Sequence, residues 1–142
     1  MLIRLLQGGM LLMLTVVIHT VVLSGMIHHF FRHHADREQL GTFAFAWLLT
    51  RFAALTVLAH LLEVAIWAAF YAWKGALPDL ETSLYFSSVT FATIGYGDVV
   101  LPPTWRLLAA MEGLTGILMC SWSGALLIGV ISRLHPRTRS DA

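Results

Sequence analysis

The sequence predicts an all-α membrane protein with three membrane-spanning helices and a shorter helix and loop that re-enter the membrane without crossing it. Of the 142 residues, 58% are hydrophobic and only 12% are charged, whereas about 25% of the residues in an average soluble domain are charged. Three apolar stretches, at about 5–31, 43–73 and 107–134, each exceed the roughly 20 residues that cross a hydrocarbon core. A fourth apolar stretch, at 80–92, is too short to span.

The composition also argues against several classes of function. The net charge of +1 provides no extended basic surface for nucleic acid. Cys120 is the one cysteine, so it cannot form a disulfide within the chain, and it belongs to no zinc or redox motif. The sequence contains no nucleophile elbow, P-loop or other catalytic motif, so we expect neither enzymatic activity nor a cofactor.

The first apolar stretch predicts a retained helix. It is longer than the apolar core of about 7–15 residues in a signal peptide, and no Ala-x-Ala site ends it. Residues 1–42 then comprise this helix and a short link, and residues 43–142 form a second unit. Arginines near the ends of the spans predict which side is cytoplasmic; they are Arg32, Arg37, Arg51, Arg133, Arg137 and Arg139. Three spans with a cytoplasmic C-terminus place the N-terminus outside.

Ionisable residues interrupt the second and third spans. His60 and Glu63 lie three residues apart on one face of the second predicted helix, and Glu112 lies in the third. Such groups are costly in a membrane and indicate a function or a specific partner. Three interpretations are open for His60 and Glu63: a structural contact between helices that includes Glu112 or Arg51, a proton-sensing pair, or a metal site with His-x-x-Glu spacing.

Four histidines gather around Arg32 at the end of the first span: His28, His29, His33 and His34. They form a pH-responsive patch, an adventitious metal-binding group or simply a polar edge of the membrane. The sequence leaves these three readings open.

Residues 80–92 predict a half-helix that enters the membrane from outside. Pro78 breaks any preceding helix, and Asp79 can cap the free N–H groups of the first turn. Glu81 adds negative charge near the positive end of the helix dipole. The carbonyl end of this helix then points toward the membrane centre.

A glycine-containing loop follows directly, with the sequence Thr93-Ile94-Gly95-Tyr96-Gly97-Asp98. Gly95 and Gly97 can adopt positive φ without a Cβ clash, which lets successive carbonyls turn to one side. Backbone at membrane depth cannot face lipid, but it can line a wet pore, where carbonyl oxygens replace the water shell of a cation such as K⁺. One chain supplies one strip of oxygens, so we expect a closed homotetramer around a shared pore.

The loop resembles the potassium-channel selectivity filter, Thr-Val/Ile-Gly-Tyr-Gly-Asp. Its surroundings over about 56–134 resemble the outer helix (43–73), pore helix (80–92) and inner helix (106–134) of bacterial pore-type potassium channels. The resemblance implies passive K⁺ passage, with K⁺ held by the Thr93 hydroxyl and four backbone carbonyls, those of Thr93, Ile94, Gly95 and Tyr96.

The resemblance also implies roles for residues around the filter. The Tyr96 ring is expected to point away from the ions, and Asp98 to lie at the outer mouth, with a plain exposed turn as its alternative. Tyr85 and Phe86 correspond to an aromatic cuff that braces the filter, or else to ordinary interfacial packing.

The third span begins with Trp105-Arg106, which resembles the start of the inner helix in simple bacterial channels. Gly116 then falls where many inner helices carry a hinge glycine, although glycine in membrane helices also serves close packing. Cys120, Gly124 and Ile128 are spaced by four residues, so they share one helix face and are candidates to line the inner cavity.

The first helix departs from the two-helix pattern, and it lacks the arginine series of a voltage sensor. We therefore expect little intrinsic voltage gating, and the sequence does not indicate what opens the pore. The predicted function is a potassium channel of the cell membrane. Alternatives are a nonconducting regulatory subunit of another channel, or a small membrane metalloprotein using His60 and Glu63, for which the sequence offers no matched third ligand.

Overall fold

The computed structural model describes residues 2–34 and 41–134 of the chain. These ranges contain four α-helices and no strand. The helices are α1 (Leu2–His34), α2 (Thr42–Trp73), α3 (Leu80–Phe91) and α4 (Arg106–Leu134). The predicted all-α architecture is therefore confirmed, and each helix lies close to its expected range.

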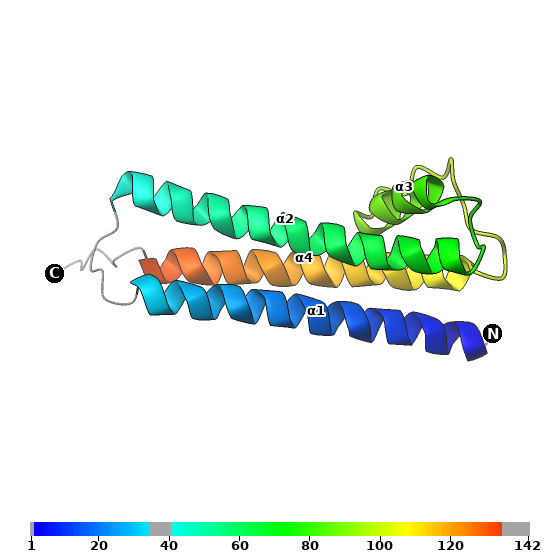
Figure 1. The fold of residues 1–142 in the computed structure, drawn as a ribbon, viewed down its shortest axis with the longest axis horizontal. Coiled ribbons are helices and arrows are strands. Elements are labelled where there is room, and N and C mark those ends of the chain that lie inside the picture. The colour runs from blue at the N-terminus through cyan, green and yellow to red at the C-terminus, as the bar shows by residue number, and fades with distance from the viewer. Residues whose placement is uncertain (1, 35–40, 135–142) are drawn as a thin grey trace, which may run out of the picture.

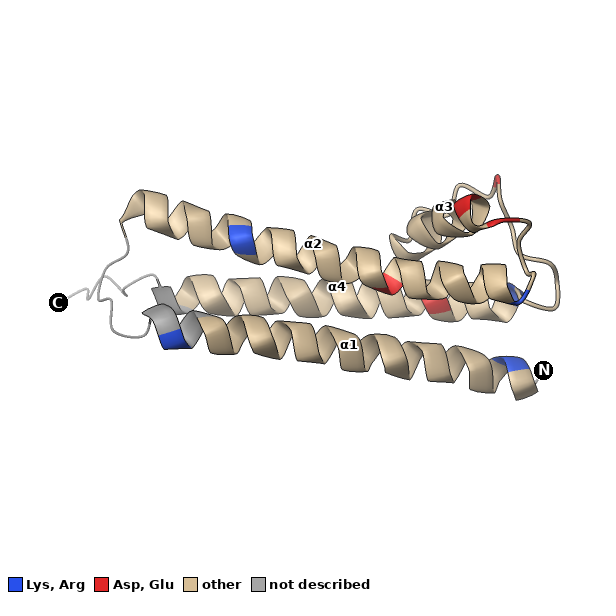
Figure 2. Cartoon of the chain, in the orientation of Figure 1, with Lys and Arg blue, Asp and Glu red and all other residues tan. Residues whose placement is uncertain are grey.

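Three of the helices are long and apolar enough to cross a membrane, over Leu2–His29, Thr42–Trp73 and Arg106–Ser132. They lie side by side as a bundle, with α3 and the loop after it gathered at one end (Figure 1). Very few charged residues interrupt their long middle sections (Figure 2). The protein is thus a multi-pass membrane protein of helices.

The helix α3 begins where its sequence signals place it. Asp79 is the N-cap, and its Oδ1 accepts a hydrogen bond of 2.7 Å from the backbone N–H of Thr82. This cap satisfies one of the free N–H groups of the first turn, and Thr82 Oγ1 also donates to Asp79 Oδ2 at 3.0 Å. These bonds hold the pKa of the Asp79 carboxyl below its usual range. The cap therefore fixes the start of the short helix that positions the filter-like loop.

The main core lies at the α3 end of the bundle. Trp67 and Tyr71 of α2 are fully buried there, against Phe86 and Phe91 of α3 and Leu108 of α4. A smaller cluster, around Phe52 and Val130, lies toward the other end, where α2 diverges from α4 (Figure 1). The packing is thus densest directly beside the loop after α3.

The helix α1 packs along the other two long helices. Leu11 joins the main core, and the Arg4 guanidinium stacks over the Trp105 ring at 3.2 Å, beside the start of α4. This cation–π contact gives Arg4 a structural role at the start of α1.

Candidate functional site

Backbone N–H groups at the start of the loop after α3 bind carbonyls in the last turn of α3. The N–H of Thr93 donates to the Thr90 carbonyl at 2.9 Å, and those of Ile94 and Gly95 donate to the Val89 carbonyl at 2.8 and 3.1 Å. Within the residues that the structure describes, no backbone bond outside the helices is accepted by a carbonyl of residues 93–98. The loop is therefore anchored by its donors while its acceptors stay available.

The backbone of this loop alternates in the sign of φ. Thr93, Gly95 and Gly97 have φ of 60°, 53° and 80°, whereas Ile94 and Tyr96 between them have negative φ. In an ordinary strand successive peptide groups alternate in direction, and a regular change in the sign of φ counters that alternation, so that carbonyls can project to one side. The predicted positive φ of both glycines is confirmed.

Thr93 carries the conformational cost of this arrangement. A β-branched residue at positive φ is a genuine outlier, and such strain costs on the order of 1–3 kcal/mol where the surrounding structure enforces it. Outliers of this kind cluster at ligand-binding sites. The loop is thus a candidate binding element on its geometry as well as on its sequence.

The side chains of the loop make little contact with their own chain. Ile94 is 54% exposed and Tyr96 is 70% exposed. The described part of the chain therefore leaves most of the Tyr96 ring uncovered.

Asp98 closes the loop and is tied to α3. The Tyr85 hydroxyl donates a hydrogen bond of 2.6 Å to Asp98 Oδ2, and this bond holds the pKa of the Asp98 carboxyl below its usual range. The same bond raises the pKa of Tyr85. Asp98 is consequently a fixed negative charge at the end of the loop.

The two aromatic residues predicted to support the loop have different roles. Tyr85 reaches the loop through Asp98. Phe86 points to α2 instead, where its buried ring packs edge-on against Tyr71 with centroids 5.6 Å apart. Phe86 therefore anchors α3 to the bundle, whereas Tyr85 is hydrogen-bonded to the loop.

Gly116 lies where α4 meets the end of α3. A Cβ at this position would overlap the carbonyl oxygen of Phe91, so the glycine permits a close approach between the two helices. This contact favours the packing interpretation of Gly116 over the hinge. Cys120, Gly124 and Ile128 are all exposed in the single chain, and their place beside an inner cavity stays a prediction.

Comparison with known proteins identifies the family. Residues 59–133, just over half of the chain, match the family model described as "Ion channel". The chain belongs to this ion-channel family. The match covers the C-terminal part of α2 from residue 59, all of α3, the loop and nearly all of α4, and it excludes α1.

A curated protein is also similar to this channel. Protein LctB of Bacillus caldotenax is 36% identical over 78 residues, which are 51% of this chain and 58% of that protein. The channel thus spans less than two thirds of the length of this relative. No solved structure matches the chain.

A buried polar cluster lies in the middle of the channel's helices. The Glu63 carboxylate accepts hydrogen bonds from His19 Nδ1 at 2.8 Å and from His60 Nδ1 at 3.1 Å. The Nε2 atoms of both rings face Ser123 Oγ, at 3.1 Å for His19 and 3.5 Å for His60. His19 and Glu63 are fully buried, so the cluster ties α1 to α2 and α4.

The suggested partners of His60 and Glu63 were wrong. Arg51 lies about 14 Å along α2 from His60, at 1.5 Å per residue, and Glu112 binds elsewhere. The structure supplies His19 and Ser123 instead. Their sequence signal was weak, because a single histidine in an apolar stretch does not reveal which helix it will face.

The cluster contains three possible metal ligands whose donor atoms lie within 4.8 Å of one another: His19, His60 and Glu63. The two imidazole rings are stacked, with centroids 5.3 Å apart and planes at 21°. Both Nδ1 atoms lie at hydrogen-bond distance from the Glu63 carboxylate. The present arrangement is a hydrogen-bonded contact between helices.

Glu112 forms a second polar contact, separate from the His19–His60–Glu63 cluster and next to α3. The Tyr71 hydroxyl donates to Glu112 Oε2 at 2.9 Å, and the buried Ser87 hydroxyl of α3 lies close to the same carboxyl, outside strict hydrogen-bond geometry. Glu112 therefore links α4 to α2 and α3, next to the helix that carries the loop.

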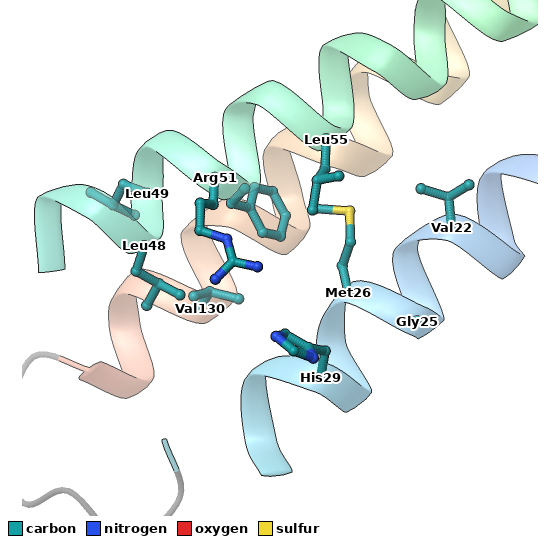
Figure 3. Close-up of a pocket in the computed structure, with 10 residues that line it drawn as sticks. Val22, Gly25, Met26, His29, Leu48, Leu49, Arg51, Leu55 and Val130 are labelled. Carbon is teal, nitrogen blue, oxygen red and sulfur yellow. The ribbon is translucent and has the colours of Figure 1, made fainter. Parts of the chain in front are cut away.

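Arg51, His28 and His29 lie toward the end of the bundle that is far from α3 (Figure 1). Arg51 and His29 face each other across a pocket between α1 and α2 (Figure 3), and His28 is exposed. The side chains of His33 and His34 lie outside the described residues, so the predicted four-histidine cluster stays a prediction.

Proposed function

We propose that this channel is selective for K⁺ and passes it passively through a ring of backbone carbonyls. The ligands are the carbonyl oxygens of Thr93, Ile94, Gly95 and Tyr96, together with the Thr93 hydroxyl. The observation that carries the proposal is the loop backbone: its φ alternates in sign, and its first three N–H groups bind carbonyls of α3 while, among the described residues, its own carbonyls accept no such backbone bond.

The physical argument concerns the unpaired carbonyls. At membrane depth, a polar backbone group without a partner costs several kcal/mol. A cation that has lost its water shell compensates that cost, because inward-facing carbonyl oxygens replace its hydration. The Asp98 carboxylate, kept charged by Tyr85, adds a negative potential that attracts cations to the same mouth.

Four copies of the chain complete the site. A single strip of oxygens cannot surround an ion, and closed rotational symmetry supplies the remaining strips. The exposed Tyr96 and Ile94 side chains are then covered by neighbouring subunits, as are some of the outward apolar faces of the helices.

We place the tetramer in the cell membrane with the filter toward the outside. The start of α1, the helix α3 and the loop lie at one end of the bundle (Figure 1). Arg32 and Arg51 lie toward the opposite end, which the distribution of basic residues assigns to the cytoplasm.

The test is cation flux from vesicles that contain the purified channel. The wild type should pass K⁺ and exclude Na⁺. Gly95→Ala should reduce K⁺ flux at least tenfold, because alanine is strained at a φ of 53°. Gly9→Ala is the matched control, since Gly9 lies in α1 with nothing within 4 Å of an added Cβ.

Two other results would point to different functions. Equal K⁺ and Na⁺ flux in the wild type would contradict selectivity. A folded tetramer that passes neither ion, but alters the currents of a partner channel, would support the nonconducting regulatory subunit.

One observation favours a second candidate function, divalent-metal binding by a membrane metalloprotein. The structure adds His19 to His60 and Glu63 as the third ligand that the sequence lacked. Metal analysis of the purified protein tests it: about one Zn²⁺ per chain, lost in His60→Ala, would support it, and a metal-free wild type after Zn²⁺ loading would exclude it.

A further inference from the structure

A pocket of about 340 Å³ opens between α1 and α2 at the end of the bundle opposite α3. Its walls are apolar side chains from three helices, among them Val22, Met26, Leu48, Phe52, Leu55 and Val130. Arg51 and His29 are the polar side chains in the lining (Figure 3). The pocket is therefore apolar along most of its wall, and its polar groups are those of Arg51 and His29.

Water is a poor occupant for such a pocket. Its volume corresponds to about eleven water molecules at about 30 Å³ each, and each buried water needs about two to four polar partners. Two polar side chains cannot satisfy that many waters. A flexible apolar chain fits better, and Gly25 leaves room for one, because nothing lies within 4 Å of its Cβ position.

Arg51 lies at the right depth to reach a lipid headgroup. The 32 residues of α2 extend about 48 Å, about 18 Å more than the hydrocarbon core, so about 9 Å projects at each end. Arg51 is about 14 Å from the start of α2, which places its backbone about 5 Å inside the core. Its long side chain can extend that distance to the phosphate level.

The charge of Arg51 is uncompensated within the described residues. The ion pairs there are those of Glu63 with His19 and His60, and no carboxylate in residues 2–34 or 41–134 forms an ion pair with Arg51. An arginine in a membrane span requires an anion or a polar partner. His29 lines the opposite wall of the pocket (Figure 3).

We propose that this pocket binds an anionic phospholipid. The phosphate contacts the Arg51 guanidinium, which presents paired N–H donors suited to two phosphate oxygens, and an acyl chain lies against Met26, Phe52 and Leu55. Basic pockets between transmembrane helices bind anionic headgroups in this manner. The lipid thereby bridges α1, which lies outside the ion-channel family match, to α2 of the pore unit.

The test is the retention of phosphatidylglycerol by the full-length protein, measured by native mass spectrometry in detergent, with phosphatidylcholine as the neutral comparison. Wild type should retain phosphatidylglycerol preferentially. Arg51→Gln should weaken that binding about five- to tenfold, as expected for the loss of one cation near a headgroup. Gly25→Leu, which fills the pocket and keeps Arg51, should weaken both lipids.

Arg32→Gln is the matched control, because it removes the same charge at the same end of the bundle from an exposed site outside the pocket. It should retain phosphatidylglycerol as the wild type does. Equal loss in Arg32→Gln and Arg51→Gln would overturn the proposal in favour of a diffuse surface charge. So would equal retention of both lipids by the wild type.

Two further arms exclude other anions. Excess inorganic phosphate should not displace phosphatidylglycerol, and displacement would show that the site recognises free phosphate. The double variant Asp36→Asn/Glu38→Gln should bind lipid as the wild type does; a large gain in binding would show that a carboxylate of the chain itself occupies the pocket. None of these readouts requires ion conduction, so they are independent of the proposed selectivity.

Discussion

Single residues set the chemistry at the end of the loop, which is the proposed outer mouth. Tyr85 and Asp98 are thirteen residues apart, yet one hydrogen bond of 2.6 Å joins the side of α3 to the end of the loop. This bond both orients the carboxylate and favours its charged form, because the hydroxyl donates to the anion. The mouth is therefore held by a charge-assisted bond that responds to acid.

The sign of this response follows from the lowered pKa of Asp98. A carboxyl whose pKa is depressed in the folded state contributes stability above its unfolded pKa, about 3.9, and loses that contribution as the pH falls through the folded value. Removing the hydrogen bond raises the pKa of Asp98 toward its ordinary value. The acid sensitivity of the mouth should then appear at higher pH.

Tyr85→Phe tests this residue-scale account. K⁺ flux measured against external pH should fall with acid in both proteins, with a midpoint at higher pH in Tyr85→Phe than in the wild type. Tyr71→Phe is not a suitable control, because it would remove a different hydrogen bond, the one from the Tyr71 hydroxyl to Glu112. Phe86→Leu, a substitution on α3 away from the loop, should leave the midpoint unchanged. Identical midpoints in the wild type and Tyr85→Phe would contradict the account.

The helix α1 is joined to α2 and α4 by buried polar contacts as well as by packing. Glu63 on α2 accepts from His19 on α1, and Ser123 on α4 lies against the other side of the same ring. Removing one partner of a buried charge-assisted pair leaves the other unsatisfied and costs about 3–5 kcal/mol, whereas replacing both with apolar groups is often close to neutral.

A double-mutant cycle tests this link between elements. His19→Leu alone should markedly lower the midpoint of thermal unfolding in detergent, and His19→Leu combined with Glu63→Leu should recover part of the loss. His28→Leu, at an exposed position of the same helix, should change the midpoint little. Strictly additive losses in the double variant would show that His19 and Glu63 do not depend on each other.

The elements themselves could be predicted from the sequence because their signals are local. Pro78 and Asp79 mark the start of α3, and the two glycines of the loop require positive φ, so a short window contains the necessary information. His19 could not be placed in this way. Its partners Glu63 and Ser123 are 44 and 104 residues away, and only the packing of three helices brings them together.

The directions in which the side chains of α3 point could not be predicted from the sequence either. Tyr85 and Phe86 are adjacent, and on a helix adjacent residues point about 100° apart. One of them can therefore face the loop while the other faces α2, and the sequence does not say which. The pocket around Arg51 was missed for a related reason, since its walls come from three separate helices.

At the scale of the whole molecule, a single chain leaves many of its apolar side chains uncovered. Large apolar side chains face outward along its helices, among them Met10, Trp47, Leu58 and Ile128. The Tyr96 ring in the loop after α3 is exposed too. Lipid covers such faces in a membrane, and other copies of the chain cover them in an assembly. The proposed tetramer thus accounts for the faces near the loop.

The proposed orientation gives a prediction at this scale. In a Cys120→Ser background, Leu2→Cys at the start of α1 should react with a membrane-impermeant maleimide added to intact cells. Arg32→Cys, near the other end of α1, should react only after the cells are opened. The reverse pattern would contradict the assignment of the arginine-rich end to the cytoplasm.

The central claim is that four copies of one loop replace the water around a potassium ion with their backbone carbonyls. A density map of the purified protein in lipid and K⁺ tests it most directly. The account predicts four chains around one axis, with ion density in single file between the carbonyls of residues 93–96. A monomer, or a loop whose carbonyls point away from any common axis, would contradict it.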